Sequence, residues 1–427
     1  MVRQLNDKVF YIGSDDLDLD LFEGQYVVPE GISYNSYLIK DGKTAILDTS
    51  DARKADQWKR SLSDALDGTD PDYLVVHHME PDHSALVAWA LERFPRLTLV
   101  ASAQALRMLP RFFPGISLEG RTLTVKEGDV IGLGEHSLRF VAAPMVHWPE
   151  VMVSFDETDG ALYSADGFGK FGALGKCGFL GSEDEDWACE ARRYYFNIVG
   201  KYGTQVQQLL KKVSALPVKA IRPLHGPMLD SGLQEYIRLY DIWSRYEPET
   251  DGVFIAVASI HGGTMEAAQM LAQILRTKGA PKVVVSDLSR TDIAENVEDA
   301  FRYPKIVLAT TTYNAEIYPF MRDYITRLTE HGFQNRTVAL IENGSWAPQA
   351  AKIMAGMFEK SKKVKILEQV VHIKSALSDE SKQQLDELAD ALSAEFIAKD
   401  PQTANKNDLK ALFTKKGTGL FPSMAKI

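Results

Sequence analysis

The 427-residue sequence changes its pattern of apolar and polar residues at positions 246–252, Tyr-Glu-Pro-Glu-Thr-Asp-Gly. This acidic stretch carries a proline and a glycine, which is typical of a linker that leads into a new strand. A chain of this length is expected to hold about two or three domains. We therefore expect a first domain over residues 1–248, a second over 252–398 and a C-terminal extension over 399–427.

After the linker, strand-like apolar runs alternate with amphipathic stretches that are long enough for helices. The runs begin near Val253, Lys282, Lys305, Arg336 and Val364. This alternation predicts an α/β domain built on a parallel, doubly wound sheet of five strands. A final helix is expected over residues 379–398, and the mildly basic residues from 400 onward are interpreted as a solvated extension.

The first half has shorter apolar, β-branched runs between turn signals, which predict mixed sheets with covering helices. The expected strands are 36–39, 44–47, 73–76, 97–100, 138–142, 151–155 and 161–164.

The composition excludes several classes of protein. With 45% hydrophobic and 25% charged residues, the balance is that of an ordinary globular protein. The net charge of −10 makes nucleic acid and anionic membranes unexpected partners. No apolar run approaches the roughly 18 residues of a membrane helix, and the first residues lack the apolar core of a secretory signal, so we expect a cytoplasmic protein. Two cysteines, Cys177 and Cys189, are too few for a disulfide framework and are interpreted as ordinary thiols.

Histidine is scarce, yet three of the nine lie in residues 77–83, His-His-Met-Glu-Pro-Asp-His. The apolar strand 73–76 runs directly into this segment, and Pro81 prevents a regular continuation. We therefore expect an irregular loop that turns four side chains toward one point: His78, Glu80, Asp82 and His83. His77 points the opposite way from its neighbour on a strand and is interpreted as structural or supporting.

Three later apolar runs also end in a His or Asp where Gly or Pro follows, at His147, Asp166 and His225. Strand ends on one sheet edge can converge, so the seven donors suffice for two metal ions about 3.5–4 Å apart with a bridging carboxylate. Imidazoles and carboxylates without thiolates favour iron, manganese or zinc, and the three anionic oxygens favour a redox metal.

Each distal donor also has an ordinary structural explanation. A strand-end histidine is more often simply hydrogen-bonded, and an aspartate before glycine is a common turn former. The remaining histidines outside the flavin loop described next have no donor-rich neighbourhood in the sequence and are interpreted as structural: His136, His331 and His372.

A second group of residues follows three strand ends of the second half. The loop 259–264, Ser-Ile-His-Gly-Gly-Thr, precedes a helix and offers a phosphate cradle, although such a turn also commonly just starts a helix. Tyr313 and Trp346 lie at the crevice where doubly wound sheets bind ligands, so they can hold a planar ring or simply pack at the rim. Together these features predict a mononucleotide flavin. The expected contacts are Ser259, Ile260, His261, Gly262, Gly263, Thr264, Thr311, Thr312, Tyr313, Asn314, Asn343, Gly344, Ser345 and Trp346.

The segment His78-x-Glu80-x-Asp82-His83 resembles the metal motif of the flavodiiron proteins, the redox branch of the metallo-β-lactamase fold. Residues 31–38, 146–149, 166–174 and 225–227 match the family as well. In hydrolases of this fold, a histidine stands at the position of Glu80 and the metals are usually zinc. The resemblance implies a metallo-β-lactamase-like αββα sandwich over 1–248 and a flavodoxin-like domain over 252–398.

The same resemblance implies two non-haem irons and FMN as cofactors. One iron is bound by His78, Glu80 and His147, and the other by Asp82, His83 and His225, with Asp166 bridging them. In some members the residue that matches His83 turns away from the metal. The chain departs from the flavodoxin pattern at His261, Glu316 and Glu342-Asn343, and the two glutamates are expected to weaken flavin binding or to make the flavin harder to reduce.

The function implied is an oxidoreductase that reduces dioxygen to water, nitric oxide to nitrous oxide, or both. The chain has no C-x-x-C, so the electrons are expected from a separate donor, a rubredoxin or a reduced flavin or deazaflavin. The family also implies a head-to-tail homodimer, or a dimer of dimers, in which the FMN of one subunit lies against the irons of the other. Two alternatives stay open: a zinc hydrolase with a flavodoxin-like adapter, and an electron carrier whose first half is structural.

Overall fold

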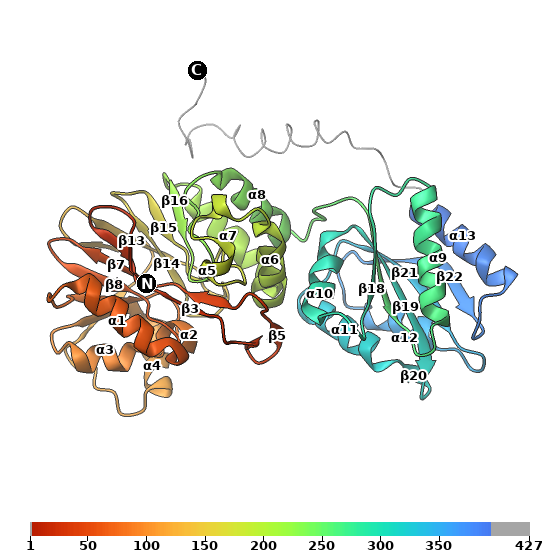
Figure 1. The fold of residues 1–427 in the computed structure, drawn as a ribbon, viewed down its shortest axis with the longest axis horizontal. Helices are drawn as coiled ribbons and strands as arrows, with labels where there is room; N and C mark the ends of the chain where they lie inside the picture. Colours follow the sequence, from red (N-terminus) through yellow and green to blue (C-terminus); the bar gives the residue numbers. More distant parts are fainter. Residues whose placement is uncertain (1, 394–427) are drawn as a thin grey trace, which may run out of the picture. The chain divides into compact units, whose positions relative to one another are not determined.

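The computed structural model describes residues 2–393 (Figure 1). They form two compact units that divide at Asp241, within helix α8 (Leu233–Ser244) and just before the expected linker. The expected extension 399–427 lies outside the described residues. No helix in the range 2–393 is long and apolar enough to cross a membrane.

The first unit contains two large sheets. The larger one has the strand order β1-β2-β7-β8-β9-β10-β11, and the smaller one has the order β12-β13-β14-β15-β16. The larger sheet comprises β1 (Arg3–Gln4), β2 (Val9–Tyr11), β7 (Tyr37–Lys40), β8 (Thr44–Leu47), β9 (Tyr73–Val76), β10 (Thr98–Ser102) and β11 (Thr122–Val125). The smaller sheet comprises β12 (Val130–Gly132), β13 (Ser137–Ala142), β14 (Met152–Asp156), β15 (Ala161–Tyr163) and β16 (Ala220–Arg222). Two short pairs complete the unit: β3 (Ser14–Asp16) with β6 (Ile32–Tyr34), and β4 (Leu21–Phe22) with β5 (Tyr26–Val27).

The two sheets pack on each other through side chains that point inward from alternate strand positions, such as Tyr37, Val75 and Phe140. The opposite face of the larger sheet packs against Trp58 and Leu91, which lie on helices of the outer layer. That layer consists of α1 (Ala55–Leu66), α3 (Val87–Arg93) and α4 (Ala103–Phe112) (Figure 1).

Further helices follow the smaller sheet's strand β15 in the chain. One of them contacts this sheet, because Lys212 Nζ on α7 (Gly203–Val213) donates to the Ala142 carbonyl of β13 at 2.7 Å. They are α5 (Leu174–Cys177), α6 (Trp187–Tyr194), the π-helical turn Tyr195–Val199 and α7 (Gly203–Val213). Three 3₁₀ turns are also present: Ala52–Lys54, Gly181–Glu183 and Gly200–Tyr202. The layers form the αββα sandwich of the metallo-β-lactamase fold, as expected.

The second unit is a flavodoxin-like doubly wound sheet. Its strand order is β18-β17-β19-β21-β22, and all neighbours in this order are parallel. The strands are β17 (Val253–Ala258), β18 (Val283–Asp287), β19 (Lys305–Tyr313), β21 (Thr337–Asn343) and β22 (Lys365–Ile373). Every residue of β17 is buried, which explains its uninterrupted apolar sequence. The five expected parallel strands are therefore confirmed.

Helices cover both faces of this sheet (Figure 1). Leu271 on α9 and Leu388 on α13 belong to one apolar core with Ile255 and Ile341 of the strands. The helices are α9 (Gly263–Thr277), α10 (Ile293–Arg302), α11 (Pro319–Glu330), α12 (Ala350–Met357) and α13 (Asp379–Ser393). The expected final helix 379–398 is seen as α13, and its last expected residues lie outside the described range.

Strand β19 extends beyond its apolar residues. It continues past Ala309 to Tyr313 and returns as β20 (Glu316–Ile317). Asn314 and Ala315 form the two-residue turn, and both have positive φ angles. Such left-handed pairs match the twist of a tight hairpin.

Candidate metal centre and flavin site

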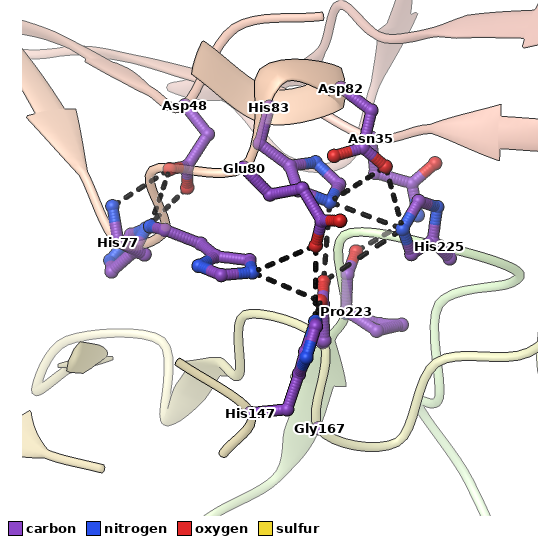
Figure 2. A network of polar contacts seen from close by, with 12 residues as sticks. Asn35, Asp48, His77, Glu80, Asp82, His83, His147, Gly167, Pro223 and His225 are labelled. Atoms are coloured by element: carbon purple, nitrogen blue, oxygen red, sulfur yellow. Dashed lines mark hydrogen bonds and ion pairs between the residues drawn. The ribbon is translucent and has the colours of Figure 1, made fainter. Parts of the chain in front are cut away.

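The seven residues expected to bind metal are brought together in the first unit, and Figure 2 labels five of them: Glu80, Asp82, His83, His147 and His225. Two groups form, each with ligand atoms within 4.8 Å of one another: His78, Glu80, His147 and Asp166 in one, and Asp82, His83 and His225 in the other. Asp166 lies between the groups. Its Oδ2 is 3.4 Å from His78 Nε2 and 3.2 Å from His147 Nε2, and its Oδ1 is 3.2 Å from His83 Nε2.

The local fold around residues 77–83 differs from the expected irregular loop. His78 does follow strand β9, but Asp82 and His83 lie on a one-turn helix, α2 (Pro81–Ser84). Pro81 occupies the first helical position, where its missing N–H costs nothing and its fixed φ angle favours the helix. Strand β9 ends at Val76, before Pro81, so this proline begins a helix and does not end the strand.

The carboxylates of Asp82 and Asp166 are buried, and none of their four oxygens accepts a hydrogen bond from any described residue. Burying an ionised carboxylate without compensation costs several kcal/mol per ion. The neighbours within reach are imidazole nitrogens, such as His83 Nε2 at 3.3 Å from Asp82 Oδ2. Oxygen and nitrogen donors that converge in a buried site fit metal cations.

The electrostatics of the centre show how strongly these groups interact. Burial on its own would raise the pKa of Asp166, but His78 and His83 hold that pKa well below its usual range. Burial lowers the pKa of His147, whereas the nearby carboxylates of Asp166 and Glu80 raise it, to about 9. The site therefore favours ionised carboxylates together with positive charge.

The histidines of the centre differ in the contact that the second ring nitrogen makes. His78 Nδ1 donates to Glu150 Oε1 at 2.8 Å, and His225 Nδ1 donates to the Ser33 carbonyl at 2.7 Å. His83 Nδ1 is buried and has no hydrogen-bond partner within residues 2–393. In His78 and His225, these contacts leave Nε2 free to act as the ligand atom.

His77 has the structural role expected for it. Its Nδ1 donates to Asp48 Oδ2 at 2.5 Å (Figure 2), and its Nε2 lies 2.8 Å from Ser154 Oγ. Both ring nitrogens are therefore used in holding two strands together.

Sequence reasoning missed two residues of the centre. Glu150 follows His147 closely in the chain, so its carboxylate near a metal motif was a usable signal. Tyr194, at the end of α6, gave no signal. Its ring centroid lies 5.5 Å from that of His225, and its buried hydroxyl has no partner among the described residues. Burial, and then the charges of Asp166 and Glu80, raise the pKa of this hydroxyl.

His136, interpreted as structural, has carboxylate neighbours that its sequence context does not show. Its Nδ1 donates to Asp156 Oδ2 at 2.7 Å, and Asp159 completes a further histidine–carboxylate group. The sequence does not show this, because the contact arises from the pairing of neighbouring strands. Asp159 already accepts a hydrogen bond from Asn6 and lies 3.9 Å from Arg222, so this group is compensated within the protein. His372 likewise has a carboxylate partner, Glu342.

The loop 259–264 has the backbone of a phosphate cradle. Gly262 has a φ of 91°, and a Cβ at Gly263 would lie 2.4 Å from the Ser375 carbonyl oxygen. Both positions therefore require glycine. Helix α9 begins here, and its first N–H groups have no partner within the helix, so they can bind an anion. Ser259 Oγ accepts from Gly262 N at 3.1 Å and shapes the turn.

The two other loops present aromatic rings at the same sheet edge. Trp346 is 83% exposed and Tyr313 is 42% exposed, which is unusual for large aromatic side chains and fits a planar ligand. Thr311 Oγ1 ties the loops together by donating to the Asn343 carbonyl at 2.9 Å. Thr312 has a different role, because its hydroxyl accepts from Gln349 N at 2.9 Å near the start of α12.

A fourth segment, residues 374–376 after β22, was missed by the sequence analysis. Ser375 N donates to Asn343 Oδ1 at 2.9 Å, and Asn343 Nδ2 donates back to the Ser375 carbonyl at 3.1 Å. The hydroxyls of Ser375 and Ser345 lie 2.5 Å apart. This segment thus braces the first and third flavin loops.

The two glutamates expected to disturb the flavin are compensated in the structure. Glu342 is buried, and its carboxylate accepts from Ala351 N at 2.9 Å and from His372 Nδ1 at 2.7 Å. Glu316 pairs with Arg322 on the surface. The carboxylate of Glu342 therefore serves the N-terminus of α12, where a negative charge is favourable.

Comparisons with known proteins find similarity to a β-lactamase-like family in the first unit and to longer proteins over most of the chain. The family model of the ODP family beta lactamase matches residues 32–226. The anaerobic nitric oxide reductase flavorubredoxin of Vibrio vulnificus is 28% identical over 81% of this chain and 70% of its own length.

Solved structures share the fold over nearly the whole chain. The rubredoxin oxygen:oxidoreductase of Desulfovibrio gigas has a TM-score of 0.86 at 21% identity and covers 97% of this chain and 100% of its own. A variant of the flavo di-iron protein of Thermotoga maritima has a TM-score of 0.83 at 25% identity, with 92% and 98% covered. The β-lactamase-like family match in the first half and these relatives together support a flavodiiron protein.

Proposed function

We propose that this protein is an oxidoreductase that reduces dioxygen to water, nitric oxide to nitrous oxide, or both, at a non-haem diiron centre supplied with electrons through FMN. The observation that carries the proposal is the buried convergence of four imidazoles and three carboxylates around Asp166. The relatives support both gases, since one is a nitric oxide reductase and another an oxygen oxidoreductase.

The proposed ligands follow the two groups of side chains. His78, Glu80 and His147 bind one iron. Asp82, His83 and His225 would hold the other, and Asp166, whose oxygens lie close to histidines of both groups, would connect the two. Two ferrous ions and a reduced FMN together supply the four electrons that convert one dioxygen to water.

The chain's own residues position and enclose these groups. Glu80 supplies a carboxylate where hydrolases of this fold have a histidine, which favours iron over zinc. Tyr194 directs a hydroxyl without a described partner toward the acidic centre, where it can donate a hydrogen bond to a bound gas.

We propose that FMN binds at the carboxyl edge of the second sheet. The N-terminus of α9 and the loop 259–264 hold the phosphate, while Tyr313 and Trp346 contact the ring. The full proposed set is the loop 259–264 with residues 311–314 and 343–346. Residues 374–376 support the loops from behind.

The electron donor, assembly and location complete the proposal. We expect a separate donor, a rubredoxin or a reduced flavin or deazaflavin, and a head-to-tail homodimer, alone or paired, in the cytoplasm. The domain bounds 1–248 and 252–398 and the extension 399–427 also remain proposals.

The proposal is tested by metal analysis and rapid mixing. We expect about two iron and one FMN per chain, and full oxidation of the reduced protein by dioxygen, nitric oxide or both within the mixing experiment. Two zinc ions and no iron would instead favour a hydrolase. If Asp166→Ala left turnover untouched, a plain electron carrier would be the better description.

A further inference from the structure

The two proposed iron subsites differ in what lies behind their histidines. His78 Nδ1 donates to the carboxylate of Glu150 at 2.8 Å, whereas His225 Nδ1 donates to a neutral carbonyl at 2.7 Å. His83 Nδ1 has no partner within residues 2–393. One subsite is thus supported by an additional negative charge that the other lacks.

Glu150 is held firmly in this position. Its side chain is buried at 2% exposure, and its Oε1 also accepts from Met79 N at 2.9 Å. Its backbone carbonyl accepts from Ser102 Oγ at 2.9 Å, and Ser102 is the N-cap of α4. The carboxylate is therefore held by Met79 N beside its contact with His78, and the backbone of Glu150 is held by Ser102.

A carboxylate that accepts from a ligating histidine fixes the orientation of the ring and raises its basicity. Both effects strengthen the bond from Nε2 to a metal ion. At a buried site the effect is large, because water does not screen the charge.

We propose that Glu150 is a positioning residue that makes the two metal subsites unequal, so that the His78 subsite binds its metal ion more tightly than the His225 subsite. This inference rests on the proposed function, because it takes the seven side chains as metal ligands. It goes beyond that function by predicting the order in which the subsites fill.

Two variants separate charge from shape. Glu150→Gln keeps an oxygen that can accept from His78 Nδ1 and Met79 N but removes the negative charge, whereas Glu150→Ala removes both. Asp156→Asn is the matched control, since Asp156 is a buried carboxylate that accepts from His136 Nδ1 at 2.7 Å outside the metal centre.

The experiment titrates the full-length, metal-stripped protein with Fe(II) anaerobically, and separately with Zn(II), against a competing chelator. We expect two unequal binding steps in the wild type. In Glu150→Gln the tighter step weakens by about 10- to 100-fold while the weaker step is unchanged. Asp156→Asn behaves as the wild type. In the reloaded iron protein, Glu150→Gln also raises the midpoint potential of one iron, because the lost anion had favoured Fe(III).

The possible outcomes distinguish the inference about Glu150 from the proposed function. If the wild type binds two ions and Glu150→Gln retains both affinities, the inference is overturned and the proposed function stands. If only Glu150→Ala lost affinity, the inference would be overturned too, because the neutral acceptor of Glu150→Gln would then be enough to keep the metal bound tightly. A wild type that binds fewer than two ions would remove the proposed function itself.

Discussion

Asp166 is the residue of the centre whose burial most needs compensation by positive charge. It is buried, its oxygens face three imidazole nitrogens within 3.4 Å, and no described residue donates a hydrogen bond to it. Its sequence context, an aspartate before a glycine, looks like an ordinary turn.

The motif at residues 78–83 could be predicted because its donors are close together in the sequence. Tyr194 could not be predicted, because it lies on a helix that is distant in the sequence.

We predict that Asp166→Asn prevents assembly of the pair of metal ions. The amide keeps the shape of the side chain but not its negative charge, so iron content should fall from about two to one or fewer per chain, and turnover by more than 100-fold. Elemental analysis and steady-state gas consumption test this, with Asp156→Asn as the control. An Asp166→Asn protein that keeps two irons would show that Asp166 does not bridge.

Tyr194→Phe should separate stability from activity. Removing a buried hydroxyl without a partner stabilises the fold by about 1 kcal/mol or leaves it unchanged, while loss of one hydrogen bond to the reacting gas lowers kcat about 10-fold. Iron and FMN content should not change. Thermal unfolding and kcat at saturating gas are the measurements. A clear loss of stability would mean that the hydroxyl has a structural partner, such as ordered water.

At the scale of elements, the sequence predicted most strands closely, because short apolar runs bounded by Gly or Pro have few alternative folds. β8 and β9 match residues 44–47 and 73–76 at both ends. The errors arise where one residue type has two uses. Pro81 begins a helix where a loop was expected, and Asn314 closes a hairpin that extends β19.

The loop 259–264 provides a direct test of the flavin site. A Cβ at Gly263 would meet the Ser375 carbonyl oxygen at 2.4 Å, so Gly263→Ala must displace the loop or the bracing segment. We expect FMN affinity to fall at least about 10-fold, the equivalent of roughly 1.4 kcal/mol, with iron content unchanged. Flavin fluorescence on titration of the deflavinated protein measures it.

Gly356→Ala is the matched control for that substitution. Gly356 lies in α12 with nothing within 4 Å of an added Cβ, so alanine should bind FMN normally and stabilise the helix slightly. Equal FMN affinity in both variants would contradict the proposed phosphate loop.

For the whole molecule, the change of pattern at residues 246–252 predicts a division into two domains, and the two compact units divide somewhat earlier, at Asp241. Long-range pairs such as His136 with Asp156 were not predictable, since strand pairing sets them. The same holds for Arg336, whose buried guanidinium donates to the Tyr246 carbonyl at 2.6 Å and also to the Phe301 carbonyl. Burial lowers the pKa of Arg336 to about 9.

Arg336 fixes the predicted linker to the second unit, so its loss should destabilise that unit alone. We predict that Arg336→Met lowers the free energy of unfolding of the FMN unit by about 2–4 kcal/mol, because several buried carbonyls lose their donors. Arg322→Met, which removes an exposed ion pair with Glu316, should cost less than about 0.5 kcal/mol. Urea unfolding followed by flavin fluorescence tests this. If iron were lost at the same urea concentration as the flavin, the substitution would not act on the FMN unit alone.

The most direct test of the central claim is anomalous diffraction from crystals of the purified protein, recorded on both sides of the iron edge. We predict two anomalous iron peaks per chain, about 3.5–4 Å apart. The carboxylate of Asp166 should lie between them, with His78 and His225 on opposite sides. A single peak, a signal only at the zinc edge, or side chains that point away from any metal would contradict it.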